Sequence, residues 1–162
     1  METVLILRWL HVMGATVLIG TGAGIAFFMF ISNRSNDAKL IAHTASIVVL
    51  ADTVFTLSAV IIQPITGTLL ALEVGWALSE GWIALSLILY LLIGLFWLPV
   101  VWIQLQMRNL ARQAAVANAP LPARYHRLYR VWFLCGIPAF AMIMAIVWLM
   151  ISRPAINLPF LA

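Results

Sequence analysis

The sequence contains few charged residues and a single cysteine, and both scarcities exclude classes of protein. Only 9% of the 162 residues are charged and 65% are hydrophobic, a balance that excludes a soluble globular domain. One cysteine, Cys135, permits neither an intramolecular disulfide nor a metal site built on cysteine pairs. Its apolar neighbours indicate a buried thiol rather than a redox centre. The sequence also has no glycine-rich phosphate loop, nucleophilic triad or zinc-ligand spacing.

The hydrophobic residues gather in blocks long enough to span a membrane, since about 20 apolar residues cross the hydrocarbon core. Four stretches meet this requirement: residues 4–31, 40–72, 82–103 and 131–151. The first is too long for a signal-peptide core and has no basic flank, so we expect it to remain as a transmembrane helix. The predicted fold is all-α, a polytopic membrane protein in which residues 1–162 form a single four-transmembrane-helix bundle.

The basic residues predict the orientation of this bundle. They concentrate between the hydrophobic blocks, in residues 32–39 and in a basic loop of residues 104–130. By the positive-inside rule both segments are cytoplasmic, and both termini then lie on the outer, periplasmic side. The net charge of +4 indicates attraction to anionic lipid headgroups rather than to nucleic acid. The expected headgroup contacts are Arg108, Arg112, Arg124, Arg127 and Arg130.

The first hydrophobic block contains a histidine that is a candidate metal ligand. Arg8 and His11 are three residues apart and share a helix face, which Gly14 and Gly22 continue inward. Small residues below a polar outer end leave room for a flat ring. His11 is therefore a candidate axial ligand of haem b, and Arg8 and Arg153 are candidate partners for its propionates near the outer surface.

A structural explanation of the same helix stays open beside the haem hypothesis. Gly20 and Gly24 form a small-xxx-small motif, which allows close helix packing in lipid. His11 is then a histidine that hydrogen-bonds a neighbouring helix. The second axial ligand of a haem is also open, because Gln63, Tyr90 and a methionine are all conceivable.

The second hydrophobic block contains an aspartate at a depth where insertion of a charged residue into the bilayer is unfavourable. Asp52 lies near mid-membrane, where insertion of an ionisable residue costs roughly 2.5 to 3.5 kcal/mol, so it is expected to face the bundle. Thr56, Ala59, Gln63 and Thr66 follow on the same face. This stripe predicts a proton path or the polar wall of a ligand cavity, with Asp52 and Gln63 as candidate catalytic residues. Hydrogen bonding between helices explains it equally well.

Several motifs resemble those of an uncharacterised family of bacterial integral membrane proteins, catalogued as a predicted four-helix domain of unknown function. The resemblance covers nearly the whole chain and implies a bacterial inner membrane, but no activity. The motifs that carry it are Arg8-Trp9-Leu10-His11-Val12, Asp52, Gln63-Pro64-Ile65-Thr66-Gly67, Trp97-Leu98-Pro99-Val100-Val101-Trp102 and Arg124-Tyr125-His126-Arg127.

The chain is more distantly similar to the HemJ-type protoporphyrinogen oxidases, four-helix membrane proteins thought to bind haem b through a first-helix histidine. His11 occupies the corresponding place, and Pro138 and Arg153-Pro154 are similar to that family's closing segment. Two features depart from the family. Residues 82–103 contain no lysine, and Gly136-Ile137 stands where the family has an Asn-Glu pair. The resemblance therefore implies a related haem or quinone-linked electron-transfer role rather than protoporphyrinogen oxidation.

Two functional hypotheses follow from the sequence. The first is a haem b-binding redox protein, a membrane oxidoreductase, in which His11 holds the iron and Asp52 with Gln63 handles protons. The second is a noncatalytic assembly or transport-associated subunit whose polar residues serve helix packing or solute passage. Its expected partner is a second copy of the chain or another membrane protein.

Overall fold

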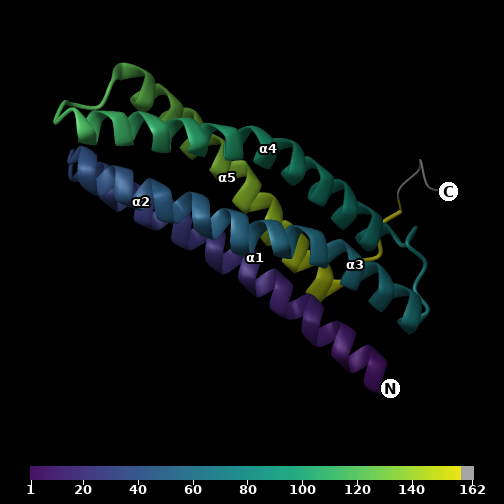
Figure 1. Ribbon diagram of the computed structural model, residues 1–162. Helices are drawn as coiled ribbons and strands as arrows, with labels where there is room; N and C mark the ends of the chain where they lie inside the picture. Colours follow the sequence, from purple (N-terminus) through teal and green to yellow (C-terminus); the bar gives the residue numbers. More distant parts are fainter. Residues whose placement is uncertain (158–162) are drawn as a thin grey trace.

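The computed structural model describes residues 1–157, and these form a helical bundle without strands. Three long helices are α1 (Glu2–Arg34), α4 (Gly81–Val116) and α5 (Ala123–Ser152). A further span runs from Ala38 to Val74 and consists of α2 (Ala38–Ala51), the π-helical segment η1 (Asp52–Thr56) and α3 (Leu57–Val74). These four spans are each long and apolar enough to cross a membrane (Figure 1). The predicted all-α, four-helix transmembrane fold is confirmed.

The helices extend further than the hydrophobic blocks. Much of the predicted basic loop is helical, because α4 continues to Val116 and α5 begins at Ala123. The residues beyond the apolar block are mainly Ala, Arg, Gln and Leu, which are good helix formers. The connection shrinks to residues 117–122, where Asn118 adopts a left-handed conformation with φ 47°. Pro120 and Pro122 then prevent the helix from continuing.

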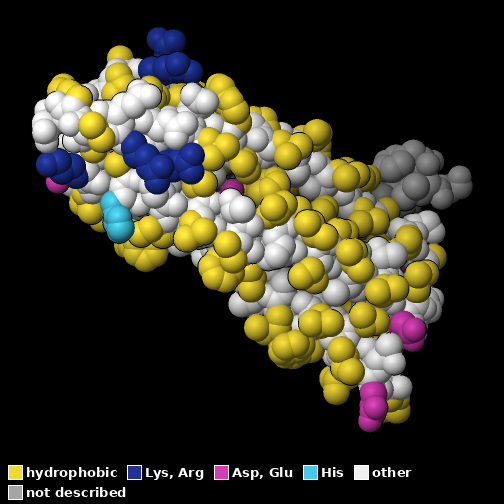
Figure 2. Space-filling model, viewed as in Figure 1, with side chains coloured by type: hydrophobic (Ala, Val, Ile, Leu, Met, Phe, Trp, Pro, Cys, Tyr) yellow, Lys and Arg dark blue, Asp and Glu magenta, His cyan; other side chains and the backbone are white. Residues whose placement is uncertain are grey.

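The two ends of the bundle differ in charge. The turn after α1 and the α4–α5 connection lie at one end, together with the Lys and Arg side chains seen in dark blue in Figure 2. We call this the basic end. The N-terminus and residues 153–157 lie at the opposite, terminal end. Between the ends the surface is largely apolar, as a lipid-facing surface requires (Figure 2).

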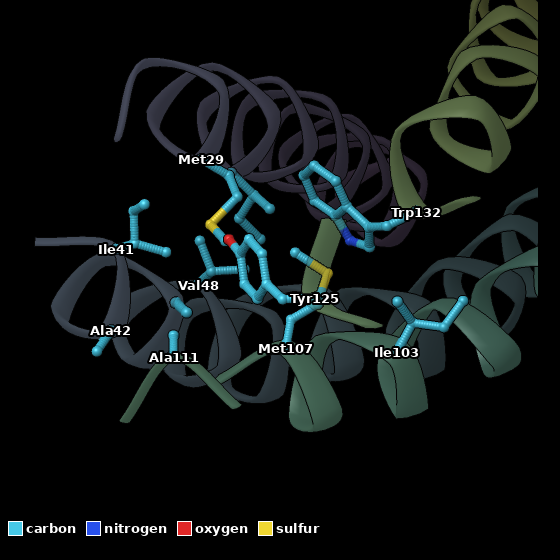
Figure 3. Packing of buried hydrophobic residues seen from close by; sticks show 11 residues of the cluster. Met29, Ile41, Ala42, Val48, Ile103, Met107, Ala111, Tyr125 and Trp132 are labelled. Atoms are coloured by element: carbon cyan, nitrogen blue, oxygen red, sulfur yellow. The ribbon is translucent and has the colours of Figure 1, made fainter. Parts of the chain in front are cut away.

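A tightly packed core fills the bundle near the basic end. Met29, Ile41, Met107 and Tyr125 are its largest fully buried side chains, and they come from four different helices (Figure 3). Ala111 is 0% exposed and allows α4 to approach its neighbours. The remaining members of this core are Ile25, Ala42, Ala45, Val48, Ile103 and Trp132.

A hydrogen bond ties this core to the neighbouring turn. The Tyr125 hydroxyl donates to Asn33 Oδ1 at 3.0 Å, and Asn33 Nδ2 donates to the Met29 carbonyl at 2.8 Å. The next helix begins with Asp37 as its N-cap, whose Oδ1 accepts from the backbone N–H of Lys39 at 2.8 Å. These bonds satisfy buried and helix-terminal polar groups that would otherwise be unpaired.

The terminal end is held by a smaller cluster. Ala71, Trp82 and Ile83 form its buried part, with Trp76, Met150 and Ile156 packed against it. The Arg153 guanidinium lies 4.5 Å from the centre of the Trp76 ring and 6.0 Å from that of Trp82, which is cation–π geometry. A Cβ at Gly81 would collide with the Ile156 carbonyl oxygen, so only glycine fits there.

Candidate binding cavity

A cavity of about 440 Å³ lies within the bundle, between the core at the basic end and the cluster at the terminal end. Side chains from α1, η1, α3, α4 and α5 line it. It exists because α1 packs mainly on α2 and α3, and α4 mainly on α2 and α5, whereas α1 and α5 touch at few places. Most of its wall is apolar or aromatic, including Ile19, Ile93, Phe96 and Phe140.

Asp52 forms part of the cavity wall and belongs to a hydrogen-bonded network. The residue is 5% exposed. Trp97 Nε1 donates to Asp52 Oδ1 at 3.4 Å, and the Gln104 amide nitrogen donates to Asp52 Oδ2 at 3.0 Å. Gln104 in turn accepts from Trp132 Nε1 at 3.2 Å. The network therefore joins the π-helical segment to both α4 and α5.

The orientation of the Gln104 amide follows from its neighbours. An indole N–H donates and never accepts, so the amide oxygen must face Trp132. The amide nitrogen is then left to donate to Asp52. The opposite orientation would place the nitrogen against the indole donor and the amide oxygen against a carboxylate oxygen.

The π-helical segment shapes this part of the wall. Its backbone includes a bond from the Leu57 N–H to the Asp52 carbonyl, five residues earlier, and both Asp52 and Thr56 are buried. Helix serines and threonines elsewhere, such as Ser46 and Ser86, donate to the carbonyl four residues before them. The Thr56 hydroxyl, by contrast, has no hydrogen-bond partner within residues 1–157, although Thr56 is 8% exposed. A π-bulge of this kind is frequent at functional sites.

A second unpaired polar atom lines the cavity on α3. Gln63 Oε1 is buried and also lacks a hydrogen-bond partner among the described residues. It faces Gly14 of α1 so closely that a Cβ there would collide with it. Between the two unpaired groups, the Tyr90 hydroxyl of α4 donates to the Val60 carbonyl at 2.5 Å. Buried polar atoms are normally paired, so two exceptions in one wall set it apart from the rest of the bundle.

His11 lies outside this cavity, in the contact between α1 and α3. Its Nδ1 is 3.1 Å from Thr66 Oγ1, which also approaches the Ile62 carbonyl at 2.9 Å. The imidazole tautomer decides which partner donates: the ring N–H to the hydroxyl, or the hydroxyl to an unprotonated Nδ1. The ring lies against Gly67, where a Cβ would be 2.8 Å from His11 Cε1. Hydrogen bonding to a neighbouring helix, the structural alternative for His11, is therefore present.

Comparison with known proteins places the chain in a family. The model of a family described as predicted integral membrane protein (DUF2269) matches residues 5–154. The chain belongs to this family. No curated protein and no solved structure matches it. The resemblance to an uncharacterised membrane-protein family is thus confirmed, while the similarity to the HemJ-type oxidases and the bacterial inner membrane stay predictions.

In this member of the DUF2269 family, the residues expected to hold haem do not form one group. His11 contacts α3, Arg8 is exposed, and Arg153 lies over Trp76. Among residues 1–157, no three His, Cys, Asp or Glu side chains are placed to hold a metal ion. Gly20 and Gly24 face no neighbouring helix of the described chain, so their predicted packing role is not met within one molecule.

The structure brings together Asp52 and Gln63, which the sequence indicated, with three residues that it did not. These are Trp97, Gln104 and Trp132, the partners in the Asp52 network. A signal for two of them existed: Gln104 follows Trp97 by seven residues, which places both on one helix face. Gln104 stands where the hydrophobic block ends, so the sequence alone places it in the basic loop.

Proposed function

We propose that the protein binds a lipophilic small molecule within the membrane, in the cavity between α1, α3, α4 and α5. This is a form of the noncatalytic, solute-handling hypothesis. The observation that carries it is a cavity of about 440 Å³ whose largely apolar wall includes the polar residues Asp52, Thr56 and Gln63. That volume is within the range of about 300 to 1,000 Å³ typical of small-molecule sites. In this proposal Asp52 and Gln63 contact the ligand.

The glycines offer a direct test, because a side chain can be added to the cavity without disturbing its walls. A Cβ at Gly94, which lines the cavity, meets nothing within 4 Å, and the same holds for Gly20, which does not line it. Gly94→Phe therefore fills the cavity, whereas Gly20→Phe adds the same group to the outer surface of α1.

The measurement is mass spectrometry of molecules extracted from the parent and both variants, purified in native-lipid nanodiscs. The expected result is a molecule enriched over the bulk lipid in the parent and in Gly20→Phe, and at least about tenfold depleted in Gly94→Phe. Three indistinguishable extracts would overturn the proposal.

Haem b binding at His11 is a second proposal, favoured by one observation. The hydrogen bond between His11 Nδ1 and Thr66 Oγ1 occupies Nδ1 and leaves Nε2 as the atom that would bind iron; ligating histidines usually have such a bond at the other ring nitrogen. Haem would supply one-electron redox chemistry when bound. Because His11 does not line the cavity, this site is separate from that of the lipophilic ligand.

The haem proposal is tested by absorption spectra of the oxidised and dithionite-reduced protein. His11→Ala is compared with His43→Ala, since His43 is an exposed histidine of α2. We expect a Soret band and reduced haem b peaks in the parent and in His43→Ala, and their loss in His11→Ala. A parent that stays colourless when haem is supplied during expression would contradict the proposal.

We further propose that the basic end faces the cytoplasm of a bacterial inner membrane, with its arginines at anionic headgroups. The gathering of Lys and Arg at one end of the bundle supports this orientation (Figure 2). This orientation is tested by fusing, after residue 157, a reporter enzyme that is active only on the periplasmic side of the membrane. We expect the reporter to be active, and an inactive reporter in a fusion that is expressed in the membrane would contradict the proposed orientation.

A further inference from the structure

In both hydrogen bonds that Asp52 makes within its network, the carboxylate is the acceptor. Trp97 and Gln104 each donate, one to each carboxylate oxygen. Neither donor can reverse its role, because indole has no acceptor and the Gln104 amide is fixed by Trp132. Hydrogen bonds donated to both oxygens stabilise the ionised form of a carboxyl group.

Among residues 1–157, no side chain is placed to balance the charge of an ionised Asp52. The described residues that line the cavity include no Lys, Arg or His, and the part of the chain that the structure describes contains no ion pair to Asp52. An uncompensated charge in the interior of a membrane protein is costly, so such residues pair with another charge. Asp52 as a residue is 5% exposed, and it lines the cavity.

The rest of the cavity wall suits an organic cation. Aromatic rings attract cations through their faces, and desolvation strengthens this attraction. Aromatic side chains of α4 and α5 line the cavity: Tyr90, Phe96, Trp97, Trp132, Phe133 and Phe140. Aliphatic side chains of α1, such as Leu18 and Ile19, complete an apolar wall for the uncharged part of the ligand.

We propose that the ligand of this cavity is a lipophilic organic cation, whose charge lies beside Asp52 and among the aromatic rings. The inference rests on the proposed function and narrows it to one class of ligand. It distinguishes this class from neutral ligands with a hydrogen-bond acceptor, such as a quinone, which would require Asp52 to be protonated and to donate.

Two phosphorus compounds of nearly equal size separate these classes. Methyltriphenylphosphonium is a lipophilic cation, whereas triphenylphosphine oxide is neutral and carries a strong acceptor. Their binding to the purified protein is measured by titration calorimetry, with Gly94→Phe and Gly20→Phe as the cavity variant and its control. We expect the cation to bind the parent and Gly20→Phe at least about tenfold more tightly than the oxide, and Gly94→Phe to lose this binding.

Two substitutions test the role of the charge. Asp52→Asn removes it, and Asp52→Glu retains it. We expect cation affinity to fall about tenfold or more in Asp52→Asn, the loss that removal of one charged partner typically causes, and to be partly kept in Asp52→Glu. Circular dichroism and gel filtration check that both variants fold, and if they do not, the comparison of the two compounds on the parent still decides.

Outcomes against the inference are distinct from failure of the proposed function. Oxide binding equal to or tighter than cation binding would overturn the inference, as would unchanged cation affinity in folded Asp52→Asn. A parent that binds neither compound would also overturn it. In each case the proposed function is judged separately, by whether Gly94→Phe depletes a molecule from the nanodisc extracts.

Discussion

The half of the bundle near the basic end and the half beyond it are both built largely from apolar helices but pack differently. Near the basic end, small residues such as Ala45 and Ala111 let the helices approach, and large side chains fill what remains (Figure 3). Beyond Asp52 the helices leave a cavity of about 440 Å³ between them. Apolar composition makes both halves membrane-compatible, and the distribution of side-chain sizes decides which half is closed.

The polar groups of the two halves differ in the same way. Near the basic end, the Tyr125 hydroxyl and the Asn33 amide satisfy one another and the backbone. In the cavity wall, Thr56 and Gln63 keep unpaired oxygens. Complete pairing is typical of a structural element, and each unpaired buried group in a protein needs a particular explanation.

The largest expected effect is the loss of Tyr125 from the packed half. Tyr125→Ala removes a side chain that is 0% exposed and leaves Asn33 unpaired. We expect the free energy of unfolding to fall by about 3 to 5 kcal/mol. Unfolding in mixed micelles by sodium dodecyl sulfate measures it. Tyr125→Phe, which loses only the hydroxyl, should cost about 1 kcal/mol, and equal losses would contradict the packing account.

Adding the same side chain to each half sharpens the comparison. Ala111→Leu inserts three carbon atoms into a filled core and should destabilise by about 1 to 3 kcal/mol. Gly94→Leu places a larger addition where a Cβ meets nothing within 4 Å and should be neutral or stabilising. Melting curves in one detergent compare the two variants directly. Similar destabilisation by both would show that the cavity does not exist in solution.

Breaking the Asp52 network should have an intermediate effect. Gln104→Leu leaves the Trp132 N–H and one Asp52 oxygen without a partner, at a cost of about 1 to 3 kcal/mol. The matched control is Gln113→Leu, at an exposed position on the same helix. Thermal unfolding followed by circular dichroism gives both values. Equal stability of the two variants would contradict the network.

The smallest expected effect is at the terminal end. Arg153→Ala removes the cation from the Trp76 ring and should cost about 0.5 to 1 kcal/mol. The readout is the urea or dodecyl sulfate midpoint. Trp76→Leu removes the same cation–π interaction. The loss of stability in the double variant should therefore be smaller than the sum of the losses in the two single variants. Fully additive losses would exclude the interaction.

The sequence predicted the spans well because each depends on local composition alone. The predicted α4–α5 connection was too long, since polar helix formers such as Arg112 continue a helix beyond the apolar block. The π-helical segment had no sequence signal, because the difference in energy between an α turn and a π turn is decided by packing. Asp52 was identified through its insertion cost, whereas its partner Gln104 depends on the register between helices, which one sequence does not reveal.

The central claim is that the half beyond Asp52 holds an open cavity that receives a molecule from the membrane. The most direct measurement is an electron cryomicroscopy structure of the protein in a native-lipid nanodisc, with a bound antibody fragment to add mass. The account predicts a discrete nonprotein density between α1 and α5 that reaches Asp52, Thr56 and Gln63. A bundle in which α1 and α5 close together and side chains fill this volume would contradict it.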